Sequence, residues 1–292
     1  MKKQPETTAK LLFLTCALTA VLALFAITFF IFYRGVPAIF TAGLINFLAG
    51  TTWSPLSLRF GIFSFIFASV VTTLGAFIVG SRIGLWCAIY LAMFCPPKVY
   101  RPLKIMIELL GGIPSVLYGF FGLVVIVPLI RNIFGGHGYS MLAAMIILAI
   151  MILPTIINLS EAALRAVPNS YYAGALALGC TKVEAVFEVV VLAAKSGINA
   201  AYLLSIGRAV GETMAVIMVI GNAPYLPGSI LDPARTLTAA IALEMSYATG
   251  LHQNMLFGIG VVLFLLVIAL NLVLMIVNRR GNQAYNTKMG DS

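Results

Sequence analysis

Long apolar runs alternate with short polar segments along this chain. The first run, residues 11–32, contains no charged residue. About 20 apolar residues are enough for a helix to cross a bilayer, and the apolar core of a cleaved signal peptide is shorter, so this run predicts a retained transmembrane helix. Later runs predict a helix from residue 62 to near 80, where Gly80 and Gly84 interrupt the apolar run, and a bent extension to 94. Further spans are predicted over residues 105–130, 141–159, 197–220 and 255–277. The pattern predicts an all-α integral membrane protein with six transmembrane helices.

The segments between the runs are polar or rich in proline. Residues 34–60 predict an external loop with Trp53 near the membrane interface, and residues 96–104 predict a compact basic loop on the inside. Residues 223–252 predict a second external loop, with a helix over residues 234–248. Arg279 and Arg280 are expected to end the last span.

The third run is interrupted by several glycines and prolines, which predicts a bent or broken helix. A helix that restarts at Pro114 and Ser115 would present free N–H groups to an anion. A proline kink that only permits close helix packing explains the same residues. In the fourth run, Pro154 predicts a kink.

The segment 160–195 is too polar to cross a membrane and too apolar to be disordered, which predicts short helices. Ser160 is a candidate N-cap, Pro168 breaks the first helix, and Gly179 suits a helix C-terminus. Thr181 and Glu184 have the spacing of a capping box. These helices predict a docking surface for a soluble partner on the inner side, and an amphipathic segment lying on lipid is the alternative.

The fifth run contains two charged residues, Arg208 and Glu212. On one continuous helix they would share a face and could pair, and ionisable groups at membrane depth usually face a bundle interior or a solute path. Gly207 and Gly211 beside them form a small-xxx-small step that would let a second helix approach. A buried ion pair that only fixes helix register is the alternative.

Composition supports a membrane protein and excludes several other classes. The chain is 61% hydrophobic and 9% charged, against about 25% charged residues in soluble domains. The net charge of +9 is not gathered into a basic cluster with aromatic residues, so nucleic-acid binding is not expected. Cysteine and histidine spacing suggests no metal site or disulfide framework. No protease, esterase or Walker A motif is present, so neither catalysis, ATP binding nor a cofactor is expected from this chain.

Lysine and arginine are concentrated in segments 1–10, 96–104, 160–195 and 279–292. Because cytoplasmic loops carry the excess of these residues, both termini are predicted to be cytoplasmic. The predicted organisation is a tail, first helix and external loop over residues 1–60, a helical membrane domain over 61–278 with its long inner segment at about 160–195, and a tail over 279–292. Six helices with one incomplete polar path suggest that a second chain completes the path.

Several motifs between about Phe60 and Asn278 are specific when taken together: Glu108–Gly119, Met151–Thr155, Ser160–Pro168, Ala177–Thr181, Gly207–Val216 with Gly221 and Asn222, and Thr236–Thr238. By these motifs the sequence resembles the PstC-type permease subunits of bacterial phosphate ABC transporters. The resemblance implies a type I importer permease of the MetI-like fold in the bacterial inner membrane, with its permease domain over residues 61–278 and its coupling region at about 160–195. It also implies a PstA-type second permease, two PstB-type ATPase subunits and a periplasmic PstS-type phosphate-binding protein as partners, besides membrane lipid.

The resemblance further implies a coupling element in the inner segment. The family pattern falls on Ala173, Gly174, Ala175 and Gly179, and Thr181 and Glu184 follow it. Ala173 replaces the family's glutamate, and Leu192 replaces its final proline. The predicted path residues are Arg208, Glu212, Ser115 and Thr213, with Gly207, Gly211 and Pro114 in helix packing.

The sequence leaves four readings of function open. Phosphate import is the reading that the resemblance favours, whereas the residues alone do not separate phosphate from sulfate, molybdate or phosphonate. An independent anion channel would need neither nucleotide nor partner. A phosphate-sensing membrane subunit would report substrate to a signalling partner, in addition to transport or instead of it.

Overall fold

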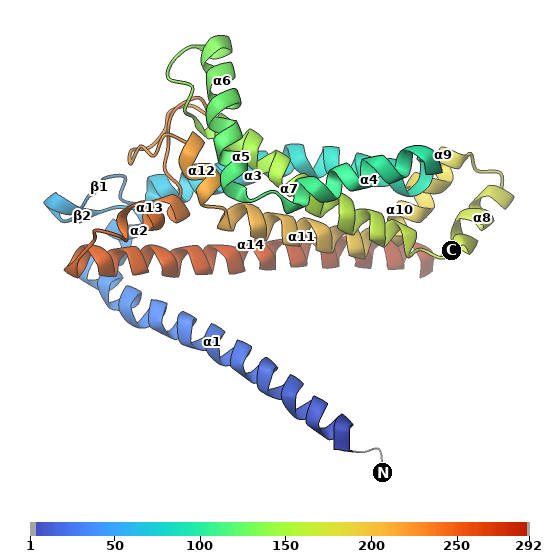
Figure 1. Ribbon diagram of the computed structural model, residues 1–292, viewed down its shortest axis with the longest axis horizontal. Helices are drawn as coiled ribbons and strands as arrows, with labels where there is room; N and C mark the ends of the chain where they lie inside the picture. The colour runs from blue at the N-terminus through green and yellow to red at the C-terminus, as the bar shows by residue number, and fades with distance from the viewer. Residues whose placement is uncertain (1–3, 291–292) are drawn as a thin grey trace.

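The structure of the protein is a computed structural model that describes residues 4–290, so the first three residues and the last two of the predicted tails lie outside the described residues. It is a bundle of long helices with a two-stranded hairpin at one end (Figure 1). Both described ends of the chain lie toward the other end of the bundle. The elements are α1 (Gln4–Ala42), α2 (Leu44–Ala49), β1 (Trp53–Ser54), β2 (Arg59–Phe60), α3 (Phe63–Ile89), α4 (Pro97–Gly112), α5 (Ser115–Phe121), α6 (Val127–Phe134), α7 (Met141–Arg165), α8 (Asn169–Ala177), α9 (Lys182–Glu184), α10 (Val191–Ala193), α11 (Lys195–Gly211), α12 (Met214–Val219), α13 (Leu237–Glu244) and α14 (Gly250–Gly290).

Short turns of other helix types join some of these elements. A 3-10 turn, η1 (Pro55–Ser57), forms the tip of the hairpin, in which Trp53 pairs with Phe60 and Ser54 with Arg59. The π-helical turns are η2 (Tyr90–Phe94), η3 (Gly122–Ile126) and η4 (Ala185–Val190).

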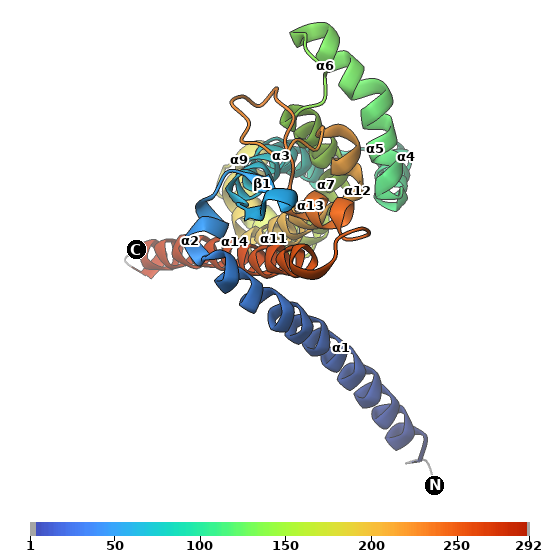
Figure 2. The same cartoon turned by 90° about the vertical axis from the view of Figure 1, so that its left-hand side faces the viewer.

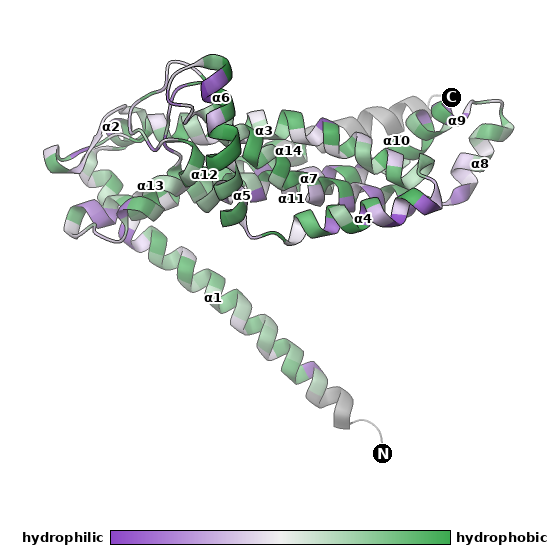
Figure 3. Cartoon of the chain, turned by 45° about the horizontal axis from the view of Figure 1, so that its top comes forward, coloured by the Kyte–Doolittle hydropathy of each residue, from purple (hydrophilic) through white to green (hydrophobic). Residues whose placement is uncertain are grey.

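Within the described residues, five helices are long and apolar enough to cross a membrane. A sixth is reached if the bent pair Lys182–Ala193 and Lys195–Gly211, which meet at 67°, counts as one span. The helical membrane fold is therefore confirmed. In Figure 3 apolar residues cover the long helices, and α1 is apolar over most of its length.

Several predicted boundaries are wrong, mostly because helices continue through charged and polar residues that were expected to end them. α1 runs through Arg34 to Ala42, and α2 and the hairpin replace the remainder of the predicted loop 34–60. α3 does not end near residue 80, residues 97–112 are helical rather than a loop, and α13 is shorter than predicted. α14 continues past Arg279 and Arg280.

The predicted break in the third run and the predicted short helices are confirmed. The third run is broken at Ile113 and Pro114, although its membrane-length part is residues 115–134 rather than 105–130. The segment after α7 forms short helices as predicted, with the capping box of Thr181 and Glu184 present. Ser160, however, is not an N-cap, because it lies buried inside α7, which continues to Arg165.

The centre of the bundle is the contact between α3 and α7. Ile147, Ile152 and Ile156 of α7 are fully buried there. Gly80 and Gly84 of α3 let α7 approach, since a Cβ on Gly84 would lie 2.7 Å from Cγ2 of Ile156. The glycines that suggested a bend are therefore packing positions in a continuous helix.

We expect Gly84→Val to destabilise the chain, because overpacking a close helix contact typically costs about 1–3 kcal/mol. The matched control is Gly207→Val, since no heavy atom lies within 4 Å of a Cβ at Gly207 apart from the helix's own backbone. Thermal unfolding of the purified chain in detergent measures both variants. Equal melting temperatures for the two variants would contradict this packing.

Candidate functional site

Two helix breaks lie side by side in the middle of the molecule. The first separates α4 from α5 at Ile113 and Pro114, both in extended conformation. The second separates α11 from α12 at Glu212 and Thr213. The breaks are neighbours because Gly119 of α5 packs on α12, where an added Cβ would lie 2.9 Å from Cα of Ala215.

Side chains take over the backbone hydrogen bonds that these breaks leave open. The buried Tyr118 hydroxyl donates to the carbonyl oxygen of Leu110 at 2.6 Å, across the first break. At the second break, Thr238 of α13 donates to the carbonyl oxygen of Glu212 at 3.1 Å. The Glu212 carboxylate accepts from the backbone N–H of Ala215 at 3.2 Å. Non-helical backbone at membrane depth requires such partners. Both breaks are therefore stabilised by hydrogen bonds within the protein.

The structure contradicts the predicted pairing of Arg208 with Glu212. The helix ends at Gly211 and Glu212 is extended, so the two residues do not share a helical face. Arg208 instead donates to Oγ1 of Thr155 on α7 at 3.3 Å. It also lies close enough to Tyr118 for electrostatic interaction. Arg208 is therefore near both breaks, and its guanidinium is exposed.

The remaining predicted path and packing residues have different surroundings. Ser115 makes no capping hydrogen bond, and Thr213 donates to the carbonyl oxygen of Gly211 at 3.2 Å. Pro114 sets the start of α5. Gly207 and Gly211 do not form the predicted seam within this chain, because no heavy atom outside their own helix backbone lies within 4 Å of a Cβ at either. The site is thus open on the face that carries these glycines and Arg208.

The predicted coupling residues lie at one end of the bundle, away from the two breaks (Figure 1). Ala173, Gly174 and Ala175 are on α8. Gly179 follows with a φ of +93°, a left-handed conformation that favours glycine. Thr181 and Glu184 then cap α9. A groove of about 440 Å³ lies between α8 and η4, and Leu178 on its edge is 89% exposed.

Sequence reasoning missed an ionic cluster at that same end, centred on the buried Glu161 of α7. Its carboxylate accepts from Lys104 Nζ and Arg165 Nε, each at 2.8 Å, and from the Tyr100 hydroxyl at 2.7 Å. This last hydrogen bond raises the pKa of Tyr100. Arg165 also donates to the carbonyl oxygen of Leu91. The i, i+4 spacing of Glu161 and Arg165 could have predicted their ion pair from the sequence. The contacts of Glu161 with Lys104 and Tyr100 could not be predicted in this way, because these two residues lie on α4, far from Glu161 in the sequence.

A second buried carboxylate, Glu244, organises the opposite end. It accepts from Arg235 Nη1 at 2.6 Å and from Trp53 Nε1 at 2.9 Å, and His252 Nε2 lies 2.7 Å away. Arg235 Nε donates to the carbonyl oxygen of Asn222. Glu244 thereby joins the hairpin, the loop after α12, α13 and α14.

Comparison with known proteins connects this arrangement to transport. The family model described as binding-protein-dependent transport system inner membrane component matches residues 80–286. A probable ABC transporter permease protein YqgH of Bacillus subtilis is 38% identical over 268 residues, covering 89% of this chain and 87% of the relative. The phosphate transport system permease protein PstC of Mesorhizobium japonicum is 35% identical over 242 residues, covering 76% and 74%.

Solved structures show the same fold at low identity. A chain of the MetNI methionine ABC transporter in an inward-facing conformation matches with a TM-score of 0.60 and 20% identity, covering 78% of this chain and 99% of that one. A chain of a bacterial alginate ABC transporter matches with a TM-score of 0.60 and 14% identity, covering 90% and 94%. The predicted MetI-like fold is therefore confirmed.

We expect Glu161→Gln to destabilise the protein, because it leaves Lys104 and Arg165 without their shared counter-charge. Breaking a buried ion pair typically costs 3–5 kcal/mol, and the partial exposure of both cations lowers this to about 2 kcal/mol. The control is Glu188→Gln, at an exposed glutamate on η4. Thermal unfolding in detergent compares the two, and an unchanged melting temperature for Glu161→Gln would contradict a stabilising cluster.

Proposed function

We propose that this chain, which belongs to the family of binding-protein-dependent transport system inner membrane components, is the permease subunit of an ATP-driven importer of inorganic phosphate. The observation that carries the proposal is 34–35% identity to several phosphate transport system permeases over about three quarters or more of the chain. The chain is a multi-pass inner membrane protein and not itself an enzyme. ATP hydrolysis belongs to separate subunits of the transporter.

The open face of the two breaks supports a second permease chain as partner. Arg208 is exposed there and Gly207 and Gly211 leave room for a helix, so another chain would close the path and bury the guanidinium. An arginine at membrane depth costs about 3 kcal/mol on insertion scales, which favours a partner or an anion beside it. A PstA-type permease fits this role.

The end of the bundle with α8 supports ATPase docking. Exposed Leu178 and the groove between α8 and η4 offer an apolar surface, and the Glu161 cluster ties α7 to α4 close by. In the proposed mechanism, two PstB-type subunits close on ATP, the short helices transmit the movement, and the path opens to a loaded PstS-type protein on the other side. Both described ends of the chain lie toward the α8 end of the bundle, so in this proposal both termini are cytoplasmic.

Arg208 is the proposed contact of the passing anion. Its guanidinium provides donors that match phosphate geometry, while Thr155 holds it beside the break. Glu212, whose carboxylate caps the restarted helix α12, would limit how tightly an anion is held. Ser115 and Thr213 would add neutral hydrogen-bond donors. Weak holding matters because a substrate bound too tightly would not be released.

We expect cells that lack this chain to regain phosphate uptake when it is supplied, and to lose that uptake when ATP is depleted. Radiolabelled phosphate measures the transport, with labelled sulfate as the parallel control. Restored uptake that survives ATP depletion would favour the independent channel. Restored uptake that prefers sulfate would favour a permease for another oxyanion.

We expect Arg208→Gln to reduce phosphate uptake at least about tenfold, because loss of one charge-assisted contact costs 1.5 kcal/mol or more. Arg82→Gln is the matched control, since Arg82 is also an exposed arginine on a membrane helix but belongs to α3, which contains neither break. Uptake is measured after immunoblotting has established equal amounts of assembled transporter. Normal uptake by Arg208→Gln would rule out a direct role.

A further inference from the structure

The hairpin β1–β2 projects from the end of the bundle opposite α8. In Figure 1 it extends beyond the first turn of α14. In Figure 2, which looks at that end, the hairpin lies in front of the helices, whereas α1 and α14 lie to one side. The hairpin therefore caps the bundle end and points away from the surface that lipid would surround.

The hairpin tip carries apolar side chains that nothing in the described chain covers. Leu56 is fully exposed and Leu58 is 69% exposed. The base of the hairpin is rigid by contrast, because Trp53 and Phe60 are buried and stack edge to face at 5.4 Å. Two exposed leucines close together on a well-packed base make the tip a candidate interaction surface.

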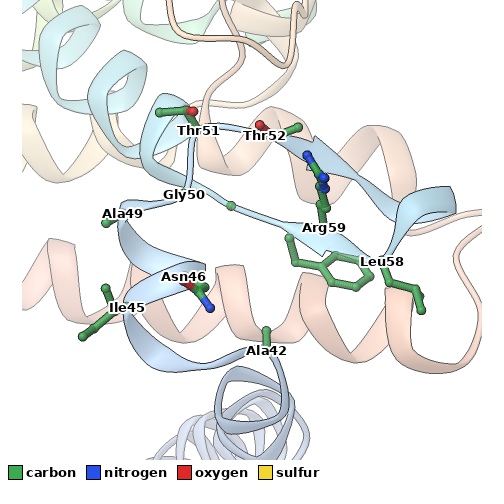
Figure 4. A pocket seen from close by; sticks show the side chains of 11 residues that line it. Ala42, Ile45, Asn46, Ala49, Gly50, Thr51, Thr52, Leu58 and Arg59 are labelled. Atoms are coloured by element: carbon green, nitrogen blue, oxygen red, sulfur yellow. The ribbon is translucent and has the colours of Figure 1, made fainter.

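Beside the tip is an open cavity of about 450 Å³ with a mixed polar and apolar lining, between α2 and the hairpin (Figure 4). Asn46, Thr51, Thr52 and Arg59 line it. In the described part of the chain no hydrogen bond or ion pair engages the Arg59 guanidinium, and its side chain is exposed. The cavity thus offers a free cation and neutral donors to an incoming acidic group.

The acidic residues at this end have other partners. Asp232 accepts from the backbone N–H groups of Gly228 and Ser229, and Glu244 is buried in its own cluster. The free charge on the hairpin is therefore positive and is carried by Arg59. A partner that fits should present carboxylates, with apolar surface for Leu56 and Leu58.

We propose that the β1–β2 hairpin, with Leu56, Leu58 and Arg59, is the docking surface for a soluble extracytoplasmic protein with an acidic face. Resting on the proposed function, this partner is the binding protein of the same transporter. Its carboxylate enters the cavity and pairs with Arg59, while the two leucines fill an apolar depression beside it. Lipid is disfavoured as the occupant because the hairpin lies over the bundle end.

The same hairpin is connected to the transport path. Trp53 donates to Glu244 at the end of α13, and Thr238 in the first turn of α13 donates to the carbonyl oxygen of Glu212 at the second break. A partner that shifts the hairpin therefore acts on the break through a single short helix. These two hydrogen bonds connect the proposed docking surface to the second break.

The experiment measures binding of the purified, phosphate-loaded binding protein to the complete transporter in lipid nanodiscs at physiological salt. We expect Arg59→Glu to raise Kd by about tenfold or more and Leu56→Asn by about threefold or more, as for central interface contacts. Arg131→Glu is the matched control, an external arginine on α6 away from the hairpin, and should change Kd by less than about twofold. Equal weakening by Arg59→Glu and Arg131→Glu would mean general charge attraction and overturn the proposal.

A labelling experiment separates protein from lipid as the occupant. Leu56→Cys is treated in spheroplasts with a membrane-impermeant maleimide, against the unsubstituted chain as background. We expect labelling that the added binding protein slows about fivefold or more, as burial in an interface core would. Resistance to labelling in the absence of the binding protein would place the tip in lipid and overturn the proposal.

Failure of the docking surface remains distinguishable from failure of the proposed function. If the transporter takes up phosphate and binds its binding protein, but Arg59→Glu and Leu56→Asn leave Kd unchanged, the proposed function stands and the proposed docking surface is wrong. A chain that restores no phosphate uptake loses the proposed function on that measurement alone.

Discussion

Polar groups at membrane depth must find partners within the protein, and this constraint shapes the middle of the molecule. Two helices are interrupted there, which frees backbone carbonyls in a region without bulk water. Tyr118 and Thr238 satisfy carbonyls of Leu110 and Glu212 from other helices. Each break is therefore held by tertiary structure, and moving α5 or α13 would change its hydrogen bonding. A path built from such breaks can open and close without unfolding.

Two buried carboxylates extend the same principle to the ends of the bundle. Glu161 gathers cationic and hydroxyl groups from α4 and α7, and Glu244 gathers side chains from the hairpin, α13 and α14. A buried carboxylate is costly unless several donors compensate it, so each one fixes the geometry of the elements that supply its donors. The α8 end and the hairpin end are thereby rigid, while the breaks lie between them.

The sequence predicted what depends on composition and local chemistry. The apolar runs, the break at Pro114 and the capping box at Thr181 follow from hydropathy and from backbone rules that act over a few residues. The pairing of Arg208 with Glu212 failed because it assumed a continuous helix, and the end of that helix at Gly211 depends on α13, whose Thr238 lies 26 residues beyond Glu212. Gly80 and Gly84 were misread for a similar reason, since only the position of α7 shows that they pack.

The open face of the site explains why one chain alone makes an incomplete path. Arg208 is held by Thr155 on one side and exposed on the other, and the glycines of α11 leave space where a neighbouring helix would fit. In a membrane that face meets either lipid or protein, and an exposed guanidinium is unfavourable against lipid. A second permease chain resolves this conflict and supplies the other wall. In the proposed transporter, the guanidinium that is unfavourable against lipid would be the charge that a passing anion meets.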